Sequence, residues 1–300
     1  MTLHVRAATP GDAAAVDTLL DAYALVRVGR PQPPGAALAR LTQPGSVPAL
    51  VHDDTGAVLG FGHAWRAGPA VRCFARVHPD ATGRGVGTAL LAELEDRAGT
   101  TLGCDVVTVM QPGTDTAGTA LLLGRGYTEI HRILRMRRSL HGYDRPAASL
   151  PPGVAVTGFD EARDAGELFA AFRAAFPADP ADEAAWWRDR RANPAEPFDP
   201  ALWFVARHGD RIVGFCHGGR HGDRDTTVGY VGDVGVVPGW RGRGIAFALL
   251  TTALAAFAVD GLPTGVLNVD ADNATGALEL YRKAGMTAEP WSTEWSRTLR

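Results

Sequence analysis

The chain has 300 residues, of which 46% are hydrophobic and 21% charged, and its formal net charge is −3. This composition is typical of a globular protein, and the length suits two domains of ordinary size. The small charge gives no electrostatic reason to expect a nucleic acid or an anionic membrane as partner. The N-terminus lacks the apolar core of a signal peptide and no run is long enough to span a bilayer, so we expect a cytoplasmic protein.

The cysteine and histidine content gives no case for a metal site. Cys73, Cys104 and Cys216 are odd in number and scattered, which indicates neither a disulfide framework nor a Cys-x-x-Cys site. Another group with metal-binding side chains falls in a predicted loop between two strands and comprises His217, His221, Asp223 and Asp225. Because these side chains have no fixed ligand spacing, a solvated loop lining an acceptor pocket is favoured, and we expect no metal.

The most informative feature is an internal repeat. Residues 77–91 resemble residues 236–250 at an offset of 159 (236 − 77), and residues 121–126 resemble 280–285 at the same offset. Upstream, the segment that ends at His63 resembles the segment that ends at His217. Two copies are too few for a solenoid and indicate a tandem pair of similar domains.

The boundary between the two copies is expected at a proline-rich linker near His141–Gly153. We therefore predict an N-terminal domain at residues 1–145 and a C-terminal domain at residues 152–300.

Hydrophobic periodicity predicts the same order of elements in each half, which in the first runs from Val5 to Leu140. In the second half these are strand Val154–Thr157, helices Asp160–Ala175 and Ala181–Arg191, strands Leu202–Arg207, Arg211–His217 and Thr227–Val237, helix Gly244–Val259, strand Gly265–Val269, helix Ala274–Ala284 and strand Trp291–Leu299. This order predicts an α/β fold of the α+β type, with a mixed sheet covered by helices on both faces.

A glycine-rich turn joins the predicted strand Thr227–Val237 to the predicted helix Gly244–Val259. Such a turn presents backbone N–H groups at a helix N-terminus, where an anion is stabilised. A Walker loop is excluded because no lysine follows the glycines, and a dinucleotide fingerprint because its third glycine is missing. Taken alone, the turn could be an ordinary connection between a strand and a helix.

The residues Arg241-x-x-Gly244-x-Ala246 resemble the Arg/Gln-x-x-Gly-x-Gly/Ala turn of the GNAT superfamily of N-acetyltransferases, which holds the pyrophosphate of coenzyme A. The resemblance implies two tandem GNAT-like acyl-CoA N-acyltransferase domains with acetyl-CoA as co-substrate. In the second half, the implied coenzyme-binding residues are Val236, Val237, Arg241, Gly242, Arg243, Gly244, Ile245, Ala246 and Asn273. In the first half, they are Val77, His78, Gly83, Arg84, Gly85, Val86, Gly87 and Thr88.

Residues 273–286 resemble the second signature of the same superfamily, Asn-x-x-Ala-x-x-x-Tyr-x-x-x-Gly-Phe. Asn273 is expected to cap the following helix, and the resemblance implies that it also contacts the pantetheine arm. Tyr281 lies at the margin of the apolar face of that helix and could be a core residue. The resemblance instead implies a general acid that protonates the leaving thiolate, a role open to a tyrosine phenol.

The first half departs from these signatures. Thr82 and Thr114 stand where the second half has Arg241 and Asn273, and Leu122 replaces Tyr281. Because leucine cannot transfer a proton, we expect the first half to keep a coenzyme pocket but to be catalytically degenerate. This division resembles that of the mycothiol synthases, tandem GNAT enzymes whose C-terminal half is active.

The general base is not fixed by the sequence. Mycothiol synthases have a glutamate where this chain has Tyr230, so both the base and a thiol-sugar substrate are open. Asp233 is the nearest carboxylate on the strand, but strict alternation places it on the opposite face from Tyr230 unless a β-bulge turns it back. The alternatives are a paired strand carboxylate at Asp233 and a proton relay through water by Tyr230.

The expected activity is acetyl transfer from acetyl-CoA to a primary amine of a small molecule, by direct attack in a ternary complex of the C-terminal domain. Backbone N–H groups at Val236 and Val237 would polarise the acetyl carbonyl. The alternatives are a mycothiol synthase, a CoA-responsive binding protein without catalysis, and a structural protein that uses one half for association. The duplicated domains could form a pseudo-dimer within a monomer, and a homodimer is the other expected state.

Overall fold

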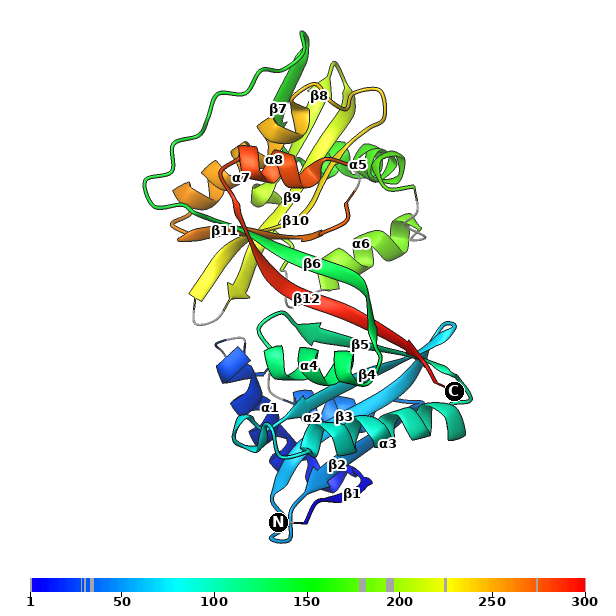
Figure 1. The fold of residues 1–300 in the computed structure, drawn as a ribbon. Coiled ribbons are helices and arrows are strands. Elements are labelled where there is room, and N and C mark those ends of the chain that lie inside the picture. Colours follow the sequence, from blue (N-terminus) through cyan, green and yellow to red (C-terminus); the bar gives the residue numbers. More distant parts are fainter. Residues whose placement is uncertain are drawn as a thin grey trace. The chain divides into compact units, whose positions relative to one another are not determined.

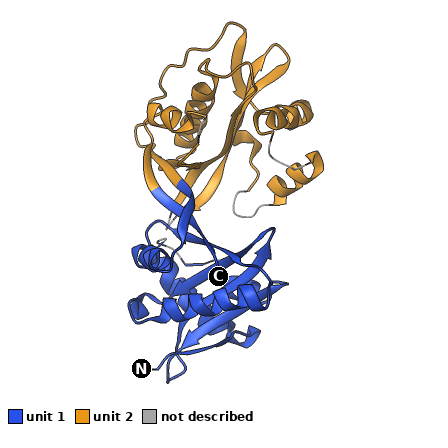
Figure 2. Ribbon diagram, turned by 45° about the vertical axis from the view of Figure 1, so that its right-hand side comes forward, with its two compact units in different colours: residues 1–133, 290–300 blue, residues 134–289 orange. Residues whose placement is uncertain are grey.

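The computed structural model describes residues 2–27, 29, 31–32, 35–177, 182–192, 197–223, 226–273 and 275–299. The chain divides into two compact units (Figure 2). The first comprises Met1–Ile133 with Pro290–Arg300, and the second comprises Leu134–Glu289. No helix among the described residues is both long and apolar enough to cross a membrane.

The first unit is a mixed sheet with helices packed on it (Figure 1), in the strand order β1-β2-β3-β4-β5-β12. Its strands are β1 (His4–Ala7), β2 (Ser46–His52), β3 (Val58–Ala67), β4 (Ala70–Val77), β5 (Val106–Pro112) and most of β12 (Thr287–Thr298). Its helices are α1 (Ala13–Arg27), α2 (Ala36–Leu41), α3 (Val86–Thr100) and α4 (Thr116–Gly124). Strands β4 and β5 are parallel, and the other pairs from β1 to β12 are antiparallel.

The second unit repeats this plan in the strand order β6-β11-β10-β9-β8-β7. Its strands are the later part of β6 (Thr128–Ser139), β7 (Val154–Gly158), β8 (Trp203–His208), β9 (Arg211–Asp223), β10 (Thr226–Val236) and β11 (Thr264–Asp270). Its helices are α5 (Glu161–Ala175), α6 (Glu183–Ala192), α7 (Ile245–Val259) and α8 (Ala277–Lys283). The predicted starts of α6 at Ala181 and of α8 at Ala274 lie outside the described residues.

The two units differ from the predicted domains at residues 1–145 and 152–300. Each unit includes part of the last strand of the other repeat. Strand β12 comes from the second repeat, yet it pairs with β5 of the first unit from Ser292 to Thr298. The end of β6 comes from the first repeat, yet it belongs to the second unit. In the first unit, β12 forms backbone hydrogen bonds with β5. Without β12, the backbone N–H and C=O groups on that side of β5 would be unpaired at a sheet edge.

Successive residues of β9 pack against helices on opposite faces of the second sheet. Phe215 packs with Phe172 of α5 and Trp186 of α6. Its neighbour Cys216 belongs to the core that α7 and α8 cover, where Tyr281 is also buried. This alternation follows from the two-residue period of a strand, and it confirms the predicted mixed sheet with helices on both faces.

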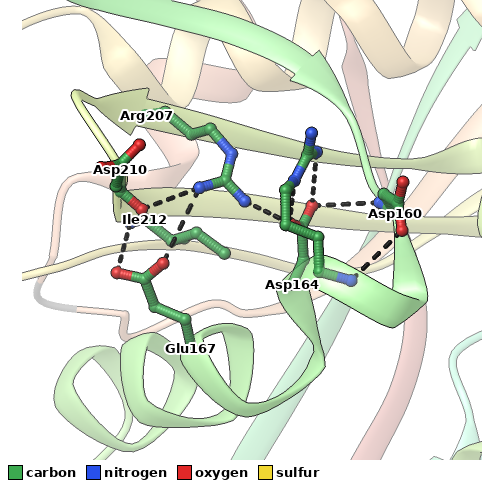
Figure 3. A network of polar contacts seen from close by, with 7 residues as sticks. Asp160, Asp164, Glu167, Arg207, Asp210 and Ile212 are labelled. Carbon is green, nitrogen blue, oxygen red and sulfur yellow. Dashed lines mark hydrogen bonds and ion pairs between the residues drawn. The ribbon is translucent and has the colours of Figure 1, made fainter.

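A buried network of polar contacts fastens α5 to the sheet (Figure 3). Asp164 of α5 is fully buried and pairs with Arg207 of β8. The same arginine donates to the backbone carbonyl of Asp210 at 2.8 Å, and Glu167 accepts from the backbone N–H of Ile212 at 3.0 Å. Each charge has a partner, so the network is structural and fixes the helix beside the candidate site.

Candidate functional site

The parallel strands of each unit separate after a short paired stretch. Strands β10 and β11 pair from Gly229 opposite Gly265 to Val231 opposite Leu267. The corresponding strands β4 and β5 pair over three residues that end with Cys73 opposite Val109. Beyond these residues the two parallel strands are no longer paired with each other, although the backbone of each continues in strand conformation. Unpaired backbone groups therefore face the gap between the strands, where an extended ligand could bind them.

A β-bulge in β10 distinguishes the second unit from the first. Val231 lies opposite Gly218 and Asp233 lies opposite His217, so Gly232 is an extra residue without an opposite partner. The bulge restores Asp233 to the face of Tyr230, and both residues line the same cavity. Strand β4 pairs with β3 in unbroken register from Gly60 to Ala67, so the first unit lacks the bulge.

Helix α7 begins with an uncapped turn. Gly244 is its N-cap with φ 82°, in the left-handed region, and no side chain caps the first turn. The first N–H groups of the helix therefore remain available, and the helix dipole favours an anion there. An added Cβ at Gly244 would lie 2.5 Å from the carbonyl oxygen of Ser149, so the position requires glycine for space as well as for conformation.

Arg241 has a structural role in this turn. Its Nε donates to the carbonyl of Val236 at 3.0 Å, and its Nη2 donates to the carbonyl of Ala175 at 3.0 Å. The guanidinium thus ties the end of β10 to the end of α5. The implied pyrophosphate contact would therefore have to come from backbone N–H groups rather than from this side chain.

The two backbone positions expected to polarise a carbonyl are not equivalent. The N–H of Val237 donates to Val213 at 3.0 Å, and its carbonyl accepts from Trp240, so both groups are already used. Because backbone groups alternate in direction along an antiparallel ladder, the N–H of Val236 points away from β9, toward the gap beside β11. The expectation is therefore wrong for Val237 and remains a prediction for Val236.

The other turn residues contribute backbone rather than side chains. Ile245 and its counterpart Val86 are buried in the cores of their units. The Arg243 guanidinium lies over the ring of Trp240, 5.3 Å from its centroid. The remaining predicted residues of the turn, Gly242 and Ala246, can offer only backbone contacts because neither has a polar side chain.

Tyr281 lies on α8, on the side of the helix that packs into the core of the second unit. Its side chain is buried in the core of the second unit, and burial raises the pKa of its phenol well above the ordinary value. Electrostatic repulsion from Cys216, Asp233 and Tyr230 raises this pKa further. The phenol is therefore protonated at neutral pH and can serve as an acid.

Asn273 does not cap a helix as predicted. Helix α8 starts only at Ala277, and its N-cap is Gly276 in the left-handed conformation with φ 77°. The amide oxygen of Asn273 instead accepts the N–H of Thr275 at 2.9 Å, within a turn that precedes the helix. Asparagine makes such turns readily because its side chain bonds to the backbone two residues on.

Asp233 is a paired and ionised carboxylate. Its Oδ2 accepts from Nη2 of Arg190 at 2.7 Å and lies 3.3 Å from Nδ1 of His217. Burial alone would raise the pKa of Asp233, but His217 and Arg190 outweigh burial and hold this pKa at about 2. Such a carboxylate is a poor proton acceptor, which argues against the predicted role of Asp233 as the general base.

His217 lies on β9 rather than in a loop, because the strand continues to Asp223. Its ring is stacked between Trp203 and Phe215, at centroid distances of 4.0 and 4.9 Å. Burial lowers the pKa of His217, so the imidazole is neutral at neutral pH. Because Asp233 is ionised, Nδ1 must carry the proton in their hydrogen bond.

A cavity of about 290 Å³ opens beside the bulge. Its wall combines aromatic rings with charged groups, and the lining residues that bear on its chemistry are Arg190, Phe198, Trp203, His217, Tyr230 and Asp233. Arg190 comes from α6 and belongs to no motif that would mark it in the sequence. His217 could be singled out in the sequence because a histidine ends the matching segment in each half.

Of the four residues considered as metal ligands, Asp225 and the side chain of Asp223 lie outside the described residues.

The first unit contains a larger cavity, of about 570 Å³, over its own glycine turn. Among the predicted residues it is lined by Val77, Gly83, Gly85, Gly87 and Thr88, but not by His78, Arg84 or Val86. Leu122 lines it at the position of Tyr281. The cavity is suited to a ligand of coenzyme size, and nothing at residue 122 can donate a proton.

Comparison with known proteins agrees with this geometry. The model of the acetyltransferase (GNAT) family matches residues 17–121 and 165–286, which is more than half of the chain. A mycothiol acetyltransferase of Thermobispora bispora is 34% identical over 294 residues, covering 96% of this chain and 97% of the relative. One from Frankia casuarinae is 34% identical over 256 residues, covering 81% and 71%.

Solved structures show the same fold. A GCN5-related N-acetyltransferase from Sphaerobacter thermophilus superposes with a TM-score of 0.74 at 26% identity, covering 99% of this chain and 96% of the other. A tandem GNAT protein from the clavulanic acid biosynthesis pathway gives a TM-score of 0.67 at 17% identity, covering 99% and 98%. The second likeness concerns the fold alone.

Proposed function

The chain belongs to the acetyltransferase (GNAT) family, and we propose that its second unit transfers the acetyl group of acetyl-CoA to a primary amine of a small molecule. The observation that carries this proposal is a cavity beside the bulge, lined by Tyr230 and Asp233, at the point where β10 and β11 separate and just before the open glycine turn at the start of α7. The family uses acetyl-CoA, which supplies an activated acetyl group as a thioester when it is bound.

The residues of the second unit have distinct roles in this proposal. The backbone N–H groups at the start of α7 hold the pyrophosphate, and the N–H of Val236 donates to the acetyl carbonyl. Tyr281 donates its phenolic proton to the sulfur that leaves. Because Asp233 is too weak a base, the proton of the acceptor's ammonium group passes to water, for which Tyr230 at the cavity wall is the candidate relay.

The first unit binds the coenzyme without turning it over. Its glycine turn and cavity support binding, whereas the unbroken register of β4 and the leucine at position 122 argue against catalysis. We therefore assign the chemistry to the second unit alone.

A mycothiol precursor is the second candidate acceptor. It is favoured by two relatives named mycothiol acetyltransferase at 34% identity, one of them matched over almost its whole length. The tyrosine at position 230, where mycothiol synthases have a glutamate, favours a different small-molecule amine.

Chromatographic measurement of acetyl-CoA consumption and CoA formation tests both candidates. We expect the full-length protein to consume acetyl-CoA with one or more members of a panel of amino sugars, amino acids, aryl alkyl amines and the mycothiol precursor. Formation of the N-acetyl product should be checked by mass spectrometry. Consumption with none of these amines, by protein shown to bind acetyl-CoA, would contradict the proposal.

A further inference from the structure

The two oxygens of the Asp233 carboxylate have different surroundings. Both the guanidinium of Arg190 and the imidazole of His217 contact Oδ2, at 2.7 and 3.3 Å. Oδ1 has no hydrogen-bond partner among the described residues. It is accessible from the surface, because it is absent from the set of buried side-chain atoms that lack a partner. With 29% of its side chain exposed, Asp233 therefore presents Oδ1 to the 290 Å³ cavity whose wall it helps to form.

The surroundings of Asp233 keep its carboxylate in place. His217 is held by ring stacking on Trp203 and Phe215. Arg190 lies over the ring of Trp186, 3.8 Å from its centroid, and so is also fixed. The two donors hold Oδ2, which fixes the direction of Oδ1 and keeps the carboxylate negative.

The cavity wall around Oδ1 suits a cation. The rings of Phe198, Trp203 and Tyr230 line it, and aromatic faces attract ammonium groups. Among the described residues of the wall, the one cationic side chain is that of Arg190, and it is already bonded to Oδ2.

The first unit provides an internal comparison. His63 lies opposite Phe74 on β3 and β4, in the register that places His217 opposite Asp233. The histidine is thus repeated, whereas the carboxylate and the bulge occur only in the second unit. His63 accordingly has a buried Nδ1 without a partner, the atom that in His217 contacts Asp233.

We propose that Asp233 is the anchor for the ammonium group of the acceptor, and that His217 and Arg190 are positioning residues that aim its Oδ1 into the cavity. This inference rests on the proposed function and names the acceptor class as amines that bind in their cationic form. It also replaces the role of proton acceptor that the strand position of Asp233 had suggested.

The anchor can be tested by binding alone, so the test does not depend on catalysis. The probes are 2-phenylethylamine, which is a cation at pH 7, and 2-phenylethanol, which is neutral and of nearly the same shape. Affinity for the full-length protein is measured by calorimetry and by quenching of tryptophan fluorescence. We expect the amine to bind about 10- to 100-fold more tightly than the alcohol, as a hydrogen bond to a charged group implies.

Substitutions then identify the groups responsible. Asp233→Asn should abolish the preference for the amine while leaving the affinity for the alcohol and for acetyl-CoA unchanged. His217→Phe should reduce the preference, and His217→Asn should restore most of it, because the asparagine amide can still donate to Oδ2. His63→Phe, at the matching position of the first unit, should behave as the wild type does.

Equal affinity of the wild-type protein for the two probes would overturn the proposal, as would a preference that survives in a folded Asp233→Asn variant. A full preference in His217→Phe would remove His217 from the positioning role. Failure of the proposed acetyl transfer would instead appear as the absence of product with every amine, whatever the outcome of the binding test.

Discussion

Asp233 lies directly opposite His217 across β10 and β9, and His217 Nδ1 is 3.3 Å from Asp233 Oδ2. The pairing depends on the bulge at Gly232, which shifts the register by one residue and turns Asp233 to the face of the cavity. Without the shift, the strand period would place this carboxylate on the other face of the sheet. A single glycine thus brings the acidic group of β10 and the histidine of β9 to one site.

The proposed acid is tested by Tyr281→Phe. We expect the variant to bind acetyl-CoA as the wild type does but to lose turnover by roughly 10²- to 10⁴-fold, the usual contribution of one positioned acid. Calorimetry measures coenzyme binding and product formation measures turnover. Tyr23→Phe is the matched control, since this tyrosine lines the cavity of the first unit, and it should retain full turnover. Wild-type turnover by Tyr281→Phe would make the tyrosine a packing residue only.

Local sequence signals predicted the elements of the second unit because those signals are strong. Glycine at position 244 marks a left-handed N-cap, and the apolar spacing that follows marks the helix. The extension of β9 past His217 was missed because Gly218 and Gly219 weaken a strand pattern. In the fold, Gly218 is needed because an added Cβ would lie 2.5 Å from the carbonyl oxygen of Leu202.

Other features could not be predicted from one sequence. Strands β6 and β12 occupy equivalent places in the two repeats, so nothing local indicates that part of each belongs to the unit of the other repeat. The bulge was foreseen only as an alternative, because glycine at position 232 also fits a regular strand. The partners of Asp233 come from β9 and α6, and their convergence is a tertiary property.

The pairing of Asp233 also predicts how stability depends on pH. The pKa of its carboxyl is lowered in the folded state, from 3.8 to about 2, so the ionised form stabilises the fold above the unfolded pKa. This contribution is lost as the pH falls from about 4 through 2. By linkage it amounts to roughly 2 kcal/mol at neutral pH.

Asp233→Asn should accordingly lower the free energy of unfolding by about that amount at pH 7, and the difference from the wild type should shrink below pH 4. Urea titrations followed by tryptophan fluorescence measure this, since Trp186 and Trp203 pack against the ring of His217. A difference that is constant from pH 7 to pH 3 would contradict the ionised pair.

The two glycine turns predict unequal effects of the same substitution. Gly244 and Gly85 both have φ 82°, so alanine at either position costs roughly 1–2 kcal/mol from the left-handed conformation. At Gly244, the new Cβ would also lie 2.5 Å from the Ser149 carbonyl, whereas at Gly85 its nearest neighbour is Leu3 at 3.9 Å. We therefore expect Gly244→Ala to lower the melting temperature further and to lose most turnover, and Gly85→Ala to keep most of it. Equal loss of turnover in two folded variants would contradict the assignment of catalysis to the second unit.

The exchanged strand gives the last prediction. Strand β12 pairs with β5 from Ser292 to Thr298, and Trp295 is buried in the core of the first unit. Removal of residues 290–300 would expose one edge of β5 and leave a cavity, and loss of the tryptophan alone typically costs roughly 3–5 kcal/mol. Hydrogen exchange of the truncated protein should therefore accelerate in α3 and β5 of the first unit, while α7 and β10 keep their protection. Acceleration confined to the second unit would instead support a division of the chain at its proline-rich linker.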